Sequence, residues 1–162
     1  MRVAIPRTIA GLVACLCVLS AGARAQQAAA PAPGDDAIPS ARLLQPEELV
    51  PLLGRSGNEK PLVFMVGPHV FYAEAHVPGS EYTGAGNQES GLEALREKVK
   101  SVPHDRLIVL YCGCCPWKKC PNIRPAYQQL ASLGFSRVQV LYVADNFGKD
   151  WVTKGYPVEK GR

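Results

Sequence analysis

The sequence lacks the charge imbalance that proteins bound to nucleic acids or membrane surfaces usually show. Of its 162 residues 20% are charged, and the formal net charge is only +4. Three of the positive charges, Arg2, Arg7 and Arg24, lie in an N-terminal stretch without acidic residues, which leaves +1 for the rest. A near-neutral body gives no electrostatic reason to expect a nucleic acid or a membrane surface as partner. The composition therefore excludes both as expected partners.

The sequence has only one long apolar run, and this run lies near the N-terminus. Thr8–Ala21 is apolar, follows two arginines and precedes Ala23-Arg24-Ala25, which fits the small-x-small site that signal peptidase cleaves. The run is short for a membrane-spanning helix. We interpret it as an export signal that is cleaved after Ala25. An uncleaved anchor and lipoprotein processing at Cys15 are the alternatives.

The rest of the chain shows no internal repeat and is long enough for one domain. Residues 26–40 are rich in Ala, Pro and Gly and have no apolar periodicity, which is typical of a flexible linker. The sequence therefore predicts a signal peptide at 1–25, a linker at 26–40 and a single domain at 41–162. We expect the mature protein in the periplasm or outside the cell, without a membrane span.

Three short apolar runs predict strands that are covered on both faces. They are nearly unbroken and rich in β-branched or aromatic residues, and they lie at Leu62–Val66, Leu107–Tyr111 and Val138–Val143. Such runs are typical of the central strands of a parallel sheet. In open sheets of this kind, ligands bind beyond the carboxyl ends of the strands.

Helical patterns alternate with these strands. Ser90-Gly91-Leu92-Glu93 has the form of a capping box, and Pro125 is expected to open the next helix, which Gly134 would end. A further pattern at Pro46–Leu53 is interrupted by Pro51, which lacks a backbone donor. Strands alternating with helices predict parallel pairing through right-handed crossovers, and hence a three-layer α/β fold.

Cysteine is absent between Cys17 and the middle of the domain, which excludes disulfides between its distant parts. Cys15 and Cys17 would leave with the signal, and the other four cysteines lie within nine residues: Cys112, Cys114, Cys115 and Cys120. An exported protein meets an oxidising compartment, where four cysteines can form three complete pairings. Their clustering nevertheless indicates a reactive or binding site rather than a scaffold.

The first clustered cysteine directly follows the predicted strand Leu107–Tyr111. Backbone N–H groups and the dipole at the start of the next helix would stabilise a thiolate at Cys112 and lower its pKa. Lys118, Lys119 and Arg124 would add positive charge and attract an anionic substrate. A solvated loop is the alternative for the two lysines, and a surface ion pair is the alternative for Arg124.

Four motifs follow one another as in rhodanese-like domains, which the chain resembles over nearly all of 41–158. They are Glu74-Ala75-His76-Val77-Pro78-Gly79, Leu107–Cys112, Leu133-Gly134-Phe135 and Trp151–Val158. The resemblance implies a five-stranded parallel sheet flanked by helices and a sulfurtransferase without a cofactor. It places Cys112 where active members carry a persulfide, which is loaded from a donor such as thiosulfate and passed to a thiol acceptor. We expect His76 to support its turn, with acid–base work as the alternative, and Trp151 to pack in the core.

Two features depart from that family. Met65-Val66-Gly67 stands where many members have Asp-x-Arg, so a charged pair behind the site is missing. The interval from Cys112 to Gly134 is also several residues longer than in ordinary members, and the excess contains the additional cysteines. The role of Cys112 therefore transfers by its place at a strand end, whereas that of Arg124 transfers only loosely.

Three interpretations of the cluster remain open. A sulfurtransferase would carry sulfur on Cys112, and Cys114, Cys115 or Cys120 would attack the persulfide, forming a disulfide and releasing reduced sulfur. A thiol–disulfide or redox-sensing protein would cycle Cys112 or Cys115 with Cys120, and an inert oxidised loop is its unreactive form. A binding module would hold Zn²⁺ or Cu⁺ on the four thiolates, although the spacing C-x-C-C-x₄-C differs from that of structural zinc sites.

Overall fold

The computed structural model describes residue 1 and residues 38–161. The predicted signal peptide at 1–25 and most of the predicted linker at 26–40 lie outside the described residues. Within the described part, none of the helices is long and apolar enough to cross a membrane.

Five parallel strands form one sheet in the order β1-β5-β4-β2-β3. Their bounds are Leu43–Leu44 for β1, Leu62–Met65 for β2, Glu81–Tyr82 for β3, Ile108–Tyr111 for β4 and Val138–Leu141 for β5. The three predicted central strands are confirmed, each slightly shorter than expected. The two edge strands were not predicted because each has only two residues, which carry no periodic signal.

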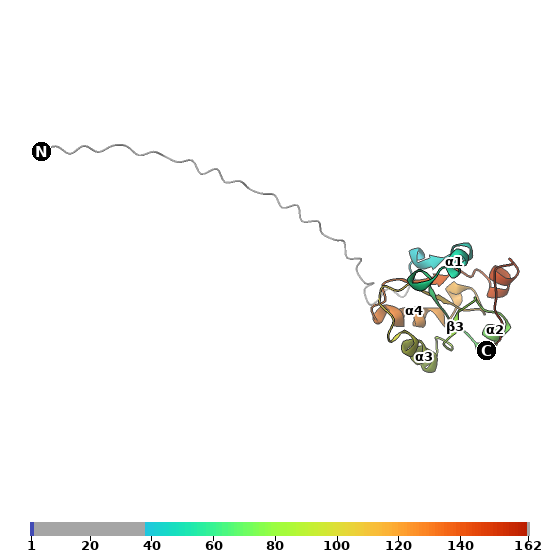
Figure 1. Cartoon of the computed structure of the whole chain (residues 1–162). Coiled ribbons are helices and arrows are strands. Elements are labelled where there is room, and N and C mark those ends of the chain that lie inside the picture. The colour runs from blue at the N-terminus through green and yellow to red at the C-terminus, as the bar shows by residue number, and fades with distance from the viewer. Residues whose placement is uncertain (2–37, 162) are drawn as a thin grey trace.

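Helices cover both faces of this sheet (Figure 1). The four α-helices are α1 Pro46–Leu53, α2 His69–Glu74, α3 Glu89–Val99 and α4 Ile123–Ser132. Four shorter elements, η1 Ser40–Arg42, η2 Gly57–Glu59, η3 Trp117–Lys119 and the π-helix η4 Gly148–Val152, lie between them. Successive strand residues point to opposite faces, so the core has two halves. Phe64 and Leu110 pack with α3 and α4, whereas Val63 and Val109 pack with α1 and η4. This is the predicted three-layer α/β fold.

The predicted helix starts were wrong in two places. The helix α3 begins at Glu89, because the Gln88 carbonyl already accepts the first helical bonds, and Ser90 therefore lies inside it rather than at its cap. The helix α4 begins at Ile123, two residues before Pro125. A proline is tolerated there because the first turn of a helix has no intrahelical acceptor for its N–H groups. Gly134 ends α4 with φ +87°, as predicted.

The helix α1 forms in spite of Pro51. Its start is held by the Gln45 backbone N–H, which donates to the Glu48 carboxylate at 2.7 Å. Pro51 lies on the exposed side of α1, and buried Leu49 anchors the helix against the sheet. Tertiary packing thus outweighs the one backbone hydrogen bond that the proline removes.

Candidate functional site

The site is built at the carboxyl end of β4, the middle strand of the sheet. All four residues of β4 are buried, since β2 and β5 pair with it on both sides. Cys112 follows directly and is only 3% exposed. The chain then passes through η3 and enters α4, so the loop joins a central strand to a helix N-terminus. This is the place that the sequence predicted for the first cysteine.

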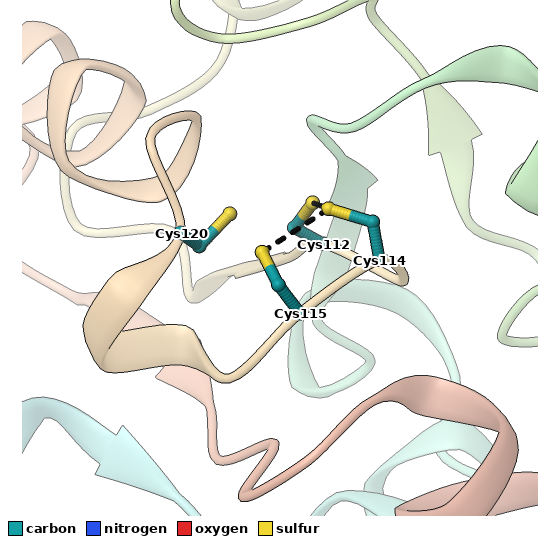
Figure 2. A group of neighbouring side chains, drawn as sticks. All are labelled: Cys112, Cys114, Cys115 and Cys120. Carbon is teal, nitrogen blue, oxygen red and sulfur yellow. Dashed lines mark hydrogen bonds between the residues drawn. The ribbon is translucent and has the colours of Figure 1, made fainter.

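The structure brings the four cysteine sulfurs of this loop together, as Figure 2 shows. Cys112 Sγ lies 3.3 Å from Cys114 Sγ, which lies 3.1 Å from Cys115 Sγ. With Cys120 included, all four Sγ atoms lie within 4.8 Å of one another, and all four cysteines are free thiols. We call this group the cysteine cluster. Three sulfur nucleophiles therefore surround the sulfur at the strand end.

The helix N-terminus acts on Cys120 rather than on Cys112. A hydrogen bond from Cys112, together with the backbone N–H groups of Asn122 and Ile123, lowers the pKa of Cys120 to about 6, although burial opposes this. The same hydrogen bond and burial raise the pKa of Cys112. Burial also raises the pKa of Cys115 to about 12. The prediction of a lowered pKa at Cys112 is therefore wrong for the reduced loop, because Cys120 takes the helix N–H groups.

Two neighbours of Cys112 were missed by the sequence argument. The buried Asn122 side chain donates from Nδ2 to Cys112 Sγ at 3.7 Å and accepts from the Asn87 backbone N–H at 3.3 Å. Gly67 leaves room for the sulfur, because a Cβ atom there would lie 2.6 Å from Cys112 Sγ. No local pattern marks either residue, since both act across the fold. Gly67 belongs to the segment that departs from the family pattern.

Cys114 lines two of the clefts that open onto the cluster. The larger, of about 660 Å³, has a polar lining that includes Thr83, Asn87 and Asn122. The second, of about 430 Å³, is lined partly by Phe71. Cys112 lies behind Cys114 and lines neither of these two clefts. A small molecule entering from either side therefore meets Cys114 first.

The predicted cationic residues lie on the side of Cys120. Lys118 and Arg124 line a third cleft, of about 310 Å³, together with Cys120 and Trp117. Lys119 is exposed in η3 beside them. The structure thus places these three predicted cations beside Cys120, the sulfur with the lowered pKa, whereas the second cleft at Cys114 is lined by Lys160 and Glu74.

His76 and Trp151 lie away from the sulfur cluster in tightly packed surroundings. The buried His76 ring stacks on Tyr72 at 3.9 Å, its Nδ1 lies 2.8 Å from the Tyr72 carbonyl, and its backbone pairs with Glu159. Trp151 is 1% exposed and donates from Nε1 to the Pro157 carbonyl at 2.8 Å. Both side chains are thus held by packing and hydrogen bonds, and the roles expected for them stay predictions.

The fold resembles solved structures of sulfur-transferring enzymes. A thiosulfate sulfurtransferase from Pseudomonas aeruginosa matches 74% of the chain at 18% identity and a TM-score of 0.55. An anaerobic ergothioneine biosynthesis enzyme from Chlorobium limicola matches 72% at 19% identity and a TM-score of 0.54. The chain has a rhodanese-like fold. It spans only 20% and 27% of the length of these two proteins. No protein-family model and no curated protein matches the sequence.

A rhodanese_3-like domain from Anabaena also matches, over 63% of this chain and 94% of that one. Its identity is 19% and its TM-score 0.48. At identities below a quarter, the likenesses to the sulfurtransferase and the ergothioneine biosynthesis enzyme extend to the fold and leave the chemistry to the residues of the site.

Proposed function

We propose that this protein is a sulfurtransferase that carries a persulfide on Cys112 and passes its outer sulfur to a thiol. The observation that carries the proposal is the position of Cys112, at the carboxyl end of the central strand of a rhodanese-like fold, with three free thiols around it. Solved structures of the same fold include a thiosulfate sulfurtransferase and a persulfide-bearing form of the enzyme EanB with ergothioneine.

The proposed loading step conserves atoms and charge. The Cys112 sulfur attacks the outer sulfur of thiosulfate, an S–S bond forms at Cys112, and sulfite leaves with the electron pair of the broken bond. The neighbouring Cys120 thiolate accepts a hydrogen bond from Cys112 and takes up the Cys112 proton as the new S–S bond forms. Asn122 Nδ2 donates to the Cys112 sulfur and would stabilise the charge that develops there.

The next step belongs to the neighbouring thiols. Attack of a thiolate on the outer persulfide sulfur moves that sulfur onward and restores Cys112. Attack on the inner sulfur forms a disulfide with Cys112 and releases hydrosulfide, so that two thiols are oxidised and one sulfane sulfur is reduced. Cys114, 3.3 Å from Cys112 and facing both clefts, is the relay we propose toward an external thiol acceptor.

The test is the intact mass of the reduced, chelator-treated protein before and after thiosulfate. We expect a gain of one sulfur that maps to Cys112, that cyanide removes, and that Cys112→Ser abolishes. Cys114→Ser is the matched control, because it keeps Cys112 and should still allow loading while it slows transfer to an external thiol. Absence of the sulfur gain in the folded wild-type protein, or its persistence in Cys112→Ser, contradicts the proposal.

The cationic cleft supports an anionic donor. Arg124→Gln and Lys118→Gln each remove one positive charge beside Cys120. We expect both substitutions to raise the KM for thiosulfate severalfold with little change in kcat, because long-range attraction to an exposed cation acts on binding. Lys154→Gln, at an exposed position in the C-terminal segment, is the control. An equal change in all three variants contradicts a role for this cleft.

A thiol–disulfide function is the second candidate, favoured by the hydrogen-bonded Cys112–Cys120 pair. It would cycle these two thiols with an external dithiol rather than carry sulfane sulfur. Equilibration in glutathione buffers tests it. A reversible loss of two thiol hydrogens that requires both cysteines, without any sulfur gain from thiosulfate, favours this function over sulfur transfer.

We also propose that the protein is exported, on the strength of the arginine-led apolar run and the Ala23-Arg24-Ala25 motif. The mature N-terminus tests this proposal. A chain that starts at Gln26 supports cleavage after Ala25, whereas an intact Met1 or a lipid-modified Cys15 contradicts it.

A further inference from the structure

We propose that the cysteine cluster is a Zn²⁺ site in which Cys112, Cys114, Cys115 and Cys120 supply all four ligands. The observation that carries this inference is the convergence of four free sulfurs from one nine-residue loop on a common point, which Figure 2 shows. The inference does not rest on sulfur transfer, because it requires only that the four sulfurs be reduced and close together.

The distances fit a tetrahedral tetrathiolate. Four sulfurs bound about 2.3 Å from Zn²⁺ in a tetrahedron are about 3.8 Å from one another. The cluster has separations of 3.3 Å and 3.1 Å for Cys112–Cys114 and Cys114–Cys115, and none exceeds 4.8 Å. Every separation is therefore within about 1 Å of the required value. Rotation of side chains in the partly exposed stretch 114–115 can supply that adjustment.

The surroundings also suit a bound cation with thiolate ligands. Asn122 Nδ2 donates to Cys112 Sγ, and the backbone N–H groups of Asn122 and Ile123 donate to Cys120. Hydrogen bonds of this kind, donated to the sulfurs that would bind the metal, orient the ligands and stabilise their charge. On binding, the thiols give up their protons to solvent and four Zn–S bonds form, with no change in oxidation state. The resulting complex has a charge of −2, which neighbouring Lys118 and Lys119 partly offset.

The number of sulfur ligands distinguishes Zn²⁺ from Cu⁺, which also binds thiolates. Closed structural zinc sites use four ligands, and all four sulfurs are within reach here. Cu⁺ binding through only two or three of the sulfurs would leave at least one cysteine dispensable. The dependence on each cysteine therefore separates the two cases.

The test uses the full chain, with Cys15 and Cys17 replaced by Ser so that the cluster holds its only thiols. The reduced protein is titrated anaerobically with ZnCl₂ alone, against a competing chelator, and native mass spectrometry counts the metal. We expect one Zn²⁺ per chain. Replacement by Co²⁺ should give the absorption of a tetrahedral tetrathiolate centre, a readout that sulfur transfer does not affect.

Four single cysteine variants then assign the ligands, and two asparagine variants serve as comparisons. Each Cys→Ser change in the cluster should weaken Zn²⁺ binding by more than about a hundredfold, and Asn122→Ala, which removes only a hydrogen bond to a ligand sulfur, by about 10- to 100-fold. Asn58→Ala, in η2 at the opposite end of the strands, should have no effect. Circular dichroism identifies variants that fail to fold, and the Asn122→Ala result keeps the proposal testable if buried Cys112 cannot be replaced.

Three results overturn the proposal. The first is that the folded, fully reduced protein binds no Zn²⁺. The second is that Zn²⁺ binding survives the loss of any one cluster cysteine. The third is a Co²⁺ spectrum typical of an octahedral site with oxygen ligands. Failure of sulfur loading alone leaves the zinc site standing, because chelator-treated protein is used for that assay and zinc-titrated protein for this one.

Discussion

Gly67 packs closely against the sulfur of Cys112. Gly67 is buried two residues after the end of β2, and a Cβ atom added there would lie 2.6 Å from Cys112 Sγ. That separation is about 1 Å shorter than an ordinary contact between carbon and another heavy atom. The sulfur cannot withdraw freely, because Cys114 Sγ lies 3.3 Å away and Asn122 Nδ2 3.7 Å away. Gly67→Ala should therefore strain the cluster itself.

The expected cost follows from two opposing contributions. Overpacking of a close-packed interior typically costs about 1–3 kcal/mol. Replacing glycine by alanine at an ordinary backbone angle returns about 0.4–1 kcal/mol, because the unfolded chain loses freedom. We therefore expect Gly67→Ala to lower the free energy of unfolding by about 1–2 kcal/mol.

A double-mutant cycle assigns this cost to the sulfur. In a Cys112→Ala background the nearest remaining side-chain atom is Met65 Cε at 3.1 Å, the end of a flexible side chain that can move aside. Gly67→Ala should then be close to neutral, so the coupling between the two positions should be about 1–2 kcal/mol. Urea unfolding of the reduced, chelator-treated proteins measures each corner of the cycle.

The control is Gly54→Ala, where the new Cβ would meet only the Pro51 carbonyl at 3.8 Å and φ is −78°. This change should be neutral or stabilising by up to about 1 kcal/mol. If Gly67→Ala costs the same with and without the Cys112 sulfur, the close approach of the two residues is not the cause, and the reasoning is refuted.

Three further predictions concern the core, the sulfur-loading step and the thiolate. Trp151→Ala should lower the free energy of unfolding in urea by about 3–5 kcal/mol, whereas neighbouring Val152→Ala should change it by no more than about 0.5 kcal/mol, because only Trp151 is buried. Similar losses of stability in the two variants would contradict this prediction. Asn122→Asp replaces the donor to Cys112 by an anion and should slow sulfur loading about tenfold, whereas Asn58→Asp should not. In reduced, metal-free protein, the rate of reaction with a small neutral alkylating agent should rise with pH around a midpoint near 6. The thiolate is the reactive form, and at Cys120 the hydrogen bonds that lower its pKa outweigh the effect of burial. Cys120→Ser should move that midpoint to about 8 or above, and an unchanged midpoint would assign the thiolate elsewhere.

The central part of the fold could be predicted from the sequence because its signals are local and long enough. The strands β2 and β4 are unbroken apolar runs and β5 is interrupted only by Gln139, and Gly134 ends α4 at a positive φ that glycine adopts readily. The edge strands and the exact helix starts could not be predicted in the same way. Two-residue strands exist only through pairing with β5 and β2, and the start of α3 depends on the Gln88 carbonyl rather than on a capping side chain.

The site was predictable in position but not in its internal arrangement. Four cysteines within nine residues after an apolar run place the cluster at a strand end whatever the loop conformation. Which sulfur receives the helix N–H groups depends on the length of the inserted stretch, which puts Cys120 three residues before the start of α4. The space that Gly67 leaves for Cys112 depends on the pairing of β2 with β4, and a local sequence pattern does not reveal this pairing.

The inserted stretch also decides how a donor can reach the sulfur at the strand end. The loop is fixed to the rest of the domain on both sides of the cluster, since Trp117 N–H donates to the Val143 carbonyl at 2.9 Å and Phe147 N–H to the Gly113 carbonyl at 3.2 Å. Opening it to expose Cys112 would break such bonds and uncover a sulfur that is 3% exposed. Onward transfer from Cys112 to an external thiol through Cys114 needs no opening, because Cys114 lines two clefts and its sulfur lies 3.3 Å from that of Cys112. A bound Zn²⁺ would occupy the same two sulfurs, so metal binding and sulfur loading should exclude each other on one chain.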